Sequence, residues 1–157
     1  TPAKSIASVG LISSYKKLRM LMTFDYEMID YGSSDFSPNF NHTFSQENQN
    51  ISDIYAKTNN TKLGISCSMD NISIRGGYSV FGGPFKNDLY ENNGEKEYIS
   101  AGLGFKKGQY SFDIAMIHCT QNEDHILYQD PTLESPDQIA NINYASNTVI
   151  LTCNYKF

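Results

Sequence analysis

The sequence predicts an all-β protein, an antiparallel transmembrane β-barrel to which this chain contributes about seven strands. Three observations predict this class: apolar residues recur at every second position in seven segments, short and long connections alternate, and aromatic residues recur near the segment ends. The mean hydropathy of −0.43 agrees with such strands, because an apolar face and a polar face average to a low value. A helical membrane protein is excluded, since no stretch approaches the roughly 18 consecutive apolar residues that a spanning helix needs.

The first four expected strands alternate between apolar and polar positions with different regularity. Residues 3–14 form the least regular one. In residues 18–28 every even position is apolar, and the odd positions include charged side chains. Residues 61–69 are apolar at the odd positions from 63 onward, and residues 72–80 are apolar at four even positions. A period of two over this length is typical of a strand with one apolar face.

The last three expected strands repeat the pattern. Residues 97–105 place Ile99, Leu103 and Phe105 on one face and glycine and serine on the other. Residues 110–116 and 149–157 alternate in the same way. No segment supports a long helix, and a short loop helix is expected within residues 46–57.

The connections between these strands are of two kinds. Lys16-Lys17, Asp70-Asn71 and Lys107-Gly108 are expected to be two-residue hairpin turns. Long polar segments separate the hairpins, at residues 31–60, 82–96 and 122–142. Short turns on one side and long loops on the other are the arrangement of an outer-membrane barrel.

The polar face distinguishes a membrane barrel from a soluble, lipocalin-like barrel, which is the alternative. A soluble barrel usually carries many Lys and Glu on its solvated outer face, whereas here that face is rich in Gly and Ser. Aromatic residues near strand ends suit the two membrane interfaces. They are Tyr15, Tyr26, Tyr31, Phe81, Tyr110, Phe112 and Tyr155. The terminal Phe157, with Tyr155 two residues earlier, resembles the assembly signal read by the bacterial outer-membrane insertion machinery.

The odd strand number bears on the extent of the domain. Bacterial single-chain barrels have even strand numbers. We therefore expect residues 1–157 to be the C-terminal part of a larger barrel domain whose N-terminal part is missing. A complete eight-stranded barrel is the other interpretation, if residues 31–60 contain one more strand.

Four segments carry a resemblance to a known family: residues 1–8, residues 24–31 with Phe24-Asp25-Tyr26-Glu27, residues 74–86 with Gly83-Pro84-Phe85-Lys86, and residues 98–105. In these segments the chain resembles the C-terminal half of the FadL/TodX-type outer-membrane transport proteins. The resemblance implies a fourteen-stranded barrel in the bacterial outer membrane. It also implies passive diffusion of hydrophobic compounds such as fatty acids or aromatic hydrocarbons. The family's plug and lateral exit lie outside this chain, so no substrate-contacting residue is carried over.

Five charged residues are expected to face the barrel lumen: Arg19, Asp25, Glu27, Arg75 and Asp113. Asp25 and Glu27 share a face about 7 Å apart, a spacing that acid–base chemistry could use. Pairing with other charges or with water is the better interpretation, and Arg75 and Asp113 are the residues most expected to belong to an interior ion-pair network. The histidines and cysteines show no metal-ligand spacing, and no serine lies in a nucleophile-elbow motif. We therefore expect no catalysis, no metal and no cofactor.

The long loop after the second strand carries Phe36, Phe40 and Phe44 at four-residue spacing. These rings could form an outer capture surface for apolar ligands, or they could simply pack against one another over the barrel mouth. The expected partners are outer-membrane lipid, the insertion machinery and a hydrophobic small molecule, with no nucleic acid. The alternative function is a small outer-membrane barrel that binds or adheres to a surface partner through residues 31–60 and 122–142.

Overall fold

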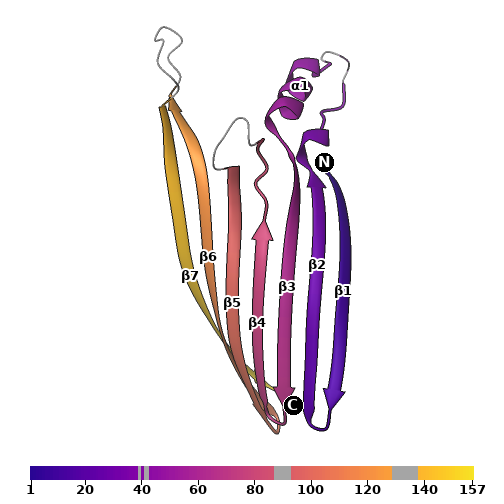
Figure 1. The fold of residues 1–157 in the computed structure, drawn as a ribbon, viewed down its shortest axis with the longest axis vertical. Coiled ribbons are helices and arrows are strands. Elements are labelled where there is room, and N and C mark those ends of the chain that lie inside the picture. The colour runs from indigo at the N-terminus through magenta and orange to yellow at the C-terminus, as the bar shows by residue number, and fades with distance from the viewer. Residues whose placement is uncertain (39, 41–42, 87–92, 129–137) are drawn as a thin grey trace.

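The computed structural model describes residues 1–38, 40, 43–86, 93–128 and 138–157. These residues form one antiparallel sheet in which each strand pairs with its sequence neighbours (Figure 1). The strands are β1 (Ala3–Tyr15), β2 (Leu18–Asp30), β3 (Lys57–Met69), β4 (Ile72–Phe81), β5 (Asn93–Lys107), β6 (Tyr110–Tyr128) and β7 (Gln138–Tyr155). The predicted all-β antiparallel class and the seven strands are confirmed.

The sheet is open, with β1 and β7 at its two edges and no pairing between them in the described residues. Every residue of β1 is exposed. Two ends of the sheet can be distinguished (Figure 1). The turn end carries the three tight turns and the C-terminus, and the loop end carries the N-terminus, the short 3₁₀ helix η1 (Tyr31–Ser33) and α1 (Ser45–Ile54).

Several strands reach further toward the loop end than the apolar periodicity predicted. The expected strands 61–69 and 97–105 begin four residues earlier, at Lys57 and Asn93. The expected strands 110–116 and 149–157 are the ends of much longer ones, because β6 continues to Tyr128 and β7 begins at Gln138. In these extensions polar residues occupy both faces, so backbone pairing continues where the apolar pattern has stopped.

The turns match the prediction at two places and differ at the third. Lys16-Lys17 and Asp70-Asn71 connect their strands as expected. The third turn is Gly108-Gln109, one residue later than predicted, because Lys107 still pairs with Tyr110. The first residue of each turn has a positive φ: 53° at Lys16, 50° at Asp70 and 60° at Gly108. The predicted loop helix is also shorter than residues 46–57, since α1 ends at Ile54.

The two faces of the sheet differ in chemistry and in crowding. The alternating apolar positions of the seven strands share one face, which we call the apolar face. The opposite side is the polar face, which also carries the exposed apolar side chains of Ile6, Ile12, Leu21 and Ile150. A Cβ built on Gly76, on the apolar face, would lie 3.6 Å from its nearest neighbour. A Cβ on Gly77, on the polar face, would lie 2.8 Å from Ser100 Oγ. At these positions the polar face is therefore the more crowded one.

The apolar face remains exposed, and the sheet has little core. Among the described residues only Ile29 and Cys119 are buried apolar side chains, and both lie on the polar face. The exposed large apolar side chains of the apolar face extend from Val9 and Leu11 on β1 to Leu151 on β7. Such an area far exceeds the few hundred Å² of apolar patch that a soluble monomer usually exposes.

The described helices are short, and none has the length and apolarity to cross a membrane. η1 and α1 belong to the connection between β2 and β3. The end of this connection contacts the first residues of the connection that follows β4. Ala56 N–H donates to Pro84 O at 2.8 Å, and Lys86 N–H donates to Ile54 O at 3.1 Å. The Tyr55 and Phe85 rings stack at a centroid distance of 5.5 Å. The described parts of the two connections therefore contact each other at the loop end.

The turn conformations allow a test of opposite sign at two positions. Lys16→Gly should raise the free energy of unfolding by about 0.5–1 kcal/mol, because glycine adopts positive φ without the Cβ clash. Gly108→Ala should lower it by about 1–2 kcal/mol for the same reason. Urea unfolding in detergent micelles, followed by circular dichroism, measures both. Two changes of the same sign would contradict the assigned turn geometry.

Candidate functional site

The five charged residues predicted to lie together do share one face of the sheet, the polar face. On β2, Arg19, Asp25 and Glu27 alternate with the apolar positions and have Ser68, Lys62 and Asn60 of β3 as their Cα partners. Arg75 on β4 and Asp113 on β6 fall on the same face through their pairing with Gly102 and Gly104 of β5. The polar face is therefore the candidate site.

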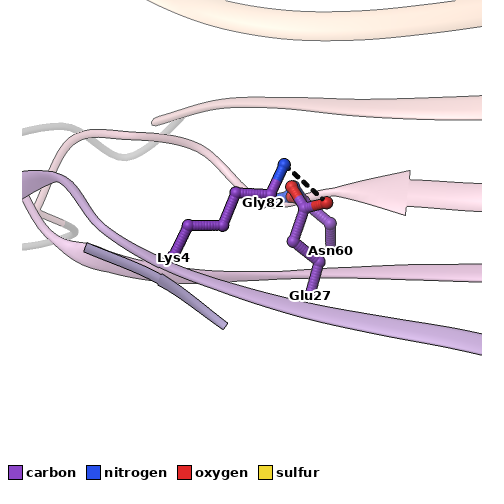
Figure 2. A network of polar contacts seen from close by, with 4 residues as sticks. All are labelled: Lys4, Glu27, Asn60 and Gly82. Carbon is purple, nitrogen blue, oxygen red and sulfur yellow. Dashed lines mark hydrogen bonds and ion pairs between the residues drawn. The ribbon is translucent and has the colours of Figure 1, made fainter. Parts of the chain in front are cut away.

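At the loop end, Glu27 is the centre of a network that connects four consecutive segments (Figure 2). Its Oε2 lies 3.0 Å from Lys4 Nζ on β1, and its Oε1 accepts a hydrogen bond from Asn60 Nδ2 on β3 at 2.9 Å. Asn60 Oδ1 in turn accepts from the Gly82 N–H at 3.2 Å, just after β4. Glu27 is only 8% exposed, so this carboxylate is used for structure rather than held ready for acid–base chemistry.

Toward the turn end, Arg75 and Asp113 form an ion pair that passes over β5. Arg75 Nη1 donates to Asp113 Oδ1 at 2.9 Å, although the two residues lie on strands that are not neighbours. Gly104 leaves the room for this contact, because a Cβ there would lie 2.5 Å from Asp113 Oδ1. A larger residue at position 104 would displace the Asp113 carboxylate or the Ser73 hydroxyl beside it.

Arg19 and Asp25 belong neither to the Glu27 network nor to the ion pair of Arg75 and Asp113. Arg19 is exposed and Asp25 is partly exposed. Neither forms a hydrogen bond or ion pair with another described residue. Asp25 and Glu27 therefore do not act as a pair, since only Glu27 is engaged.

A third cluster lies between these two and was missed by the sequence analysis. Lys62 Nζ lies 5.1 Å from the centroid of the Phe81 ring, which meets the Tyr98 ring edge-on at 5.4 Å. Tyr98 has Cys119 of β6 as its Cα partner. Phe81 was expected at a membrane interface, yet its Cα partners Asn60 and Lys96 place it on the polar face. The apolar positions of residues 72–80 are even, so the odd number of Phe81 could have predicted its place on the polar face.

The three phenylalanines of the long loop do not form one surface. The Phe36 and Phe44 rings contact each other at a centroid distance of 5.6 Å, whereas the Phe40 side chain is fully exposed. Asn48 of α1 holds Phe36 in place, accepting from its N–H at 2.8 Å and donating to its carbonyl at 3.0 Å. Two of the rings therefore pack within the loop, and Phe40 stands apart from them.

At the C-terminus, Tyr155 and Phe157 lie side by side on the apolar face of the turn end. Their rings meet edge-on at 5.1 Å, and Tyr155 also contacts the Tyr110 ring at 5.0 Å. Phe157 extends beyond the last paired residue of β7 and is fully exposed. The pair is thus accessible to a partner at the sheet edge.

The described part of the chain holds no group of three or more His, Cys, Asp or Glu side chains arranged to bind a metal ion. The comparisons with known proteins add no relative: no family model, no curated protein and no solved structure matches the chain.

The loop-end network gives a test with a matched control. A Cβ at Gly82 would lie 2.9 Å from the carbonyl oxygen of Asn59 and would also clash with Thr58 Oγ1, so the backbone must move. Gly82→Ala should therefore destabilise the sheet by about 1–3 kcal/mol. Gly10→Ala is the control, because its Cβ would have no neighbour closer than 4.0 Å. Thermal unfolding in micelles compares the two, and equal midpoints would contradict the role of Gly82.

Proposed function

We propose that this chain forms part of the wall of a bacterial outer-membrane β-barrel through which hydrophobic small molecules diffuse passively. The observation that carries the proposal is the continuous apolar face on the exposed side of the sheet, opposite a crowded polar face. A membrane barrel has this arrangement, with lipid outside and a polar interior, and a soluble barrel has the reverse.

The height of the apolar band supports a membrane. Apolar positions on β2 run from Leu18 to Met28, which is about 33 Å along the strand and about 25 Å in height at a tilt of about 40°. On β6 they run from Tyr110 to Met116, about 20 Å, before His118 interrupts them. The apolar band of outer-membrane barrels is about 25 Å tall. The polar extensions of β6 and β7 would then rise above the lipid on the side of the long loops.

Tyrosines at the margins of the apolar face are also typical of a membrane interface. Tyr15, Tyr110 and Tyr155 lie at the turn end. Tyr78 lies toward the loop end, where its hydroxyl donates to Glu97 Oε1 at 3.0 Å. The Tyr155 hydroxyl donates to Gln109 Oε1 at 3.2 Å at the opposite margin. A ring against lipid with its hydroxyl among polar groups is the preferred state of an interfacial tyrosine.

The direction of the edge strands supports a larger barrel. Because the sheet is antiparallel and has seven strands, β1 and β7 run in the same direction. An all-antiparallel barrel therefore needs an odd number of further strands between these edges. The fourteen-stranded barrel of the FadL/TodX-type proteins, which the sequence resembles, would supply seven. Diffusion of hydrophobic compounds is proposed from that resemblance and rests on no identified substrate contact.

The native cysteines test the membrane orientation. Cys67 and Cys153 lie on the apolar face, and Cys153 lines an apolar groove of about 580 Å³ there. In lipid vesicles a membrane-permeant maleimide should label both thiols, and a charged, water-soluble maleimide should label neither. Lys16→Cys, at an exposed turn, is the positive control for the water-soluble reagent. Labelling of Cys153 by the water-soluble reagent as fast as that of Lys16→Cys would contradict the membrane assignment.

Adjacent glycines on opposite faces test transport. Gly77→Trp places a bulky ring on the polar face, where it should reduce the uptake of a fluorescent hydrophobic compound by vesicles containing the complete barrel to which these strands belong. Gly76→Trp places the same ring on the apolar face and should leave uptake unchanged. Uptake no faster than that of protein-free vesicles, or equal loss in both variants with intact strand content, would contradict the transport proposal.

A further inference from the structure

The turn end of the polar face contains a polar pocket with a volume of about 330 Å³. It is lined by residues from the ends of β3, β4, β5 and β6, and it opens beside the ion pair described above. The polar side chains that matter for binding are Ser68, Ser73, Arg75, Lys106, Ser111 and Asp113. At about 30 Å³ per water molecule, the pocket has room for roughly ten waters, or for a small ligand with part of its hydration shell.

Hydrogen-bond donors in this pocket outnumber the acceptors that the chain offers them. Asp113 engages one N–H of Arg75, and the other guanidinium N–H groups have no acceptor among the described residues. The hydroxyls of Ser68, Ser73 and Ser111 likewise form no hydrogen bond within the described chain. Gly104 forms the floor between them and keeps the space free, because any side chain there would meet Ser73 and Asp113.

The charge around the pocket is positive when the acidic residues that already form ion pairs are set against their basic partners. Asp113 is neutralised by Arg75, and Asp70 binds Lys17 of the adjacent turn at 3.0 Å. Lys106 lines the pocket with no acidic partner in the described residues. Arg19 adds a further charge on the same face, directly across the strand pair from Ser68. An anion is therefore the ligand that the pocket favours.

We propose that this pocket binds a small oxyanion of the phosphate type. The planar guanidinium of Arg75 matches two oxygens of such a ligand, and the three serine hydroxyls supply further donors around it. Lys106 contributes charge at the rim. The proposal depends on the pocket alone, so it holds in micelles whether or not the sheet belongs to a transporting barrel.

Titration of the full chain in nonionic detergent micelles with inorganic phosphate, followed by isothermal calorimetry, tests the proposal. Wild type should show one saturable site that chloride at equal ionic strength does not fill. Arg75→Gln should weaken binding at least about tenfold, because a charged hydrogen-bonding group is lost. Asp113→Asn should tighten it, because the competing carboxylate is removed. Lys62→Gln, on the same face but outside the pocket, is the control for general loss of positive charge.

The expected changes in phosphate affinity have opposite signs for Arg75→Gln and Asp113→Asn. Simple damage to the sheet would instead weaken binding in both variants, so the two variants distinguish a binding site from such damage. A short-chain phosphatidate, soluble as a monomer, distinguishes the sources of the anion. Tighter binding of phosphatidate than of phosphate assigns a lipid headgroup, and equal or weaker binding assigns the free ion. The proposal is overturned if phosphate shows no saturable binding, if chloride binds equally well, or if Asp113→Asn binds no better than wild type.

Discussion

The structure depends on one constraint: its apolar side chains lie on the less crowded face of a curved sheet. Only Ile29 and Cys119 are buried apolar side chains among the described residues, so burial within the chain contributes little to stability in water. In the described residues each strand pairs with both of its neighbours, except β1 and β7, which pair on one side only. In the proposed membrane barrel, lipid would cover the apolar face and further strands would pair with the two edges.

The polar face follows from the same constraint, because side chains that converge on a concave surface must be small or must bind one another. Gly77 and Gly104 occupy places where a Cβ would meet a neighbouring side chain at 2.8 Å or less. Between these small residues, Glu27 connects β1, β2 and β3, and Arg75 reaches over β5 to Asp113. Polar contacts therefore hold the strands together on this face, as apolar packing does in the core of a soluble protein.

Alternation of apolar and polar residues predicted every strand and assigned the charged residues to one face, because that pattern is local. It could not predict how far β6 and β7 extend, since positions such as His118 and Asn147 are polar on the otherwise apolar face. It also could not predict contacts that depend on register and reach across strands. Lys4 lies in the least regular strand, and only the pairing of Ile6 with Glu27 brings its ammonium to the Glu27 carboxylate. The oxyanion pocket is of this kind as well, because its side chains come from four strands.

The different crowding of the two faces bears on the two barrel types that alternation alone left open. A lipocalin-like barrel places its apolar side chains on the concave side, where they converge on one another. In this sheet the more crowded side carries serine, glycine and paired charges, whereas a Cβ on Gly76 on the other side would make only ordinary contacts, at 3.6 Å or more. Curling the sheet the opposite way would spread the side chains of the polar face apart and stretch the contact between Arg75 and Asp113 across β5. Completion of this sheet as a barrel with its apolar face outward requires no such change, and this supports the proposed membrane barrel over the lipocalin-like alternative.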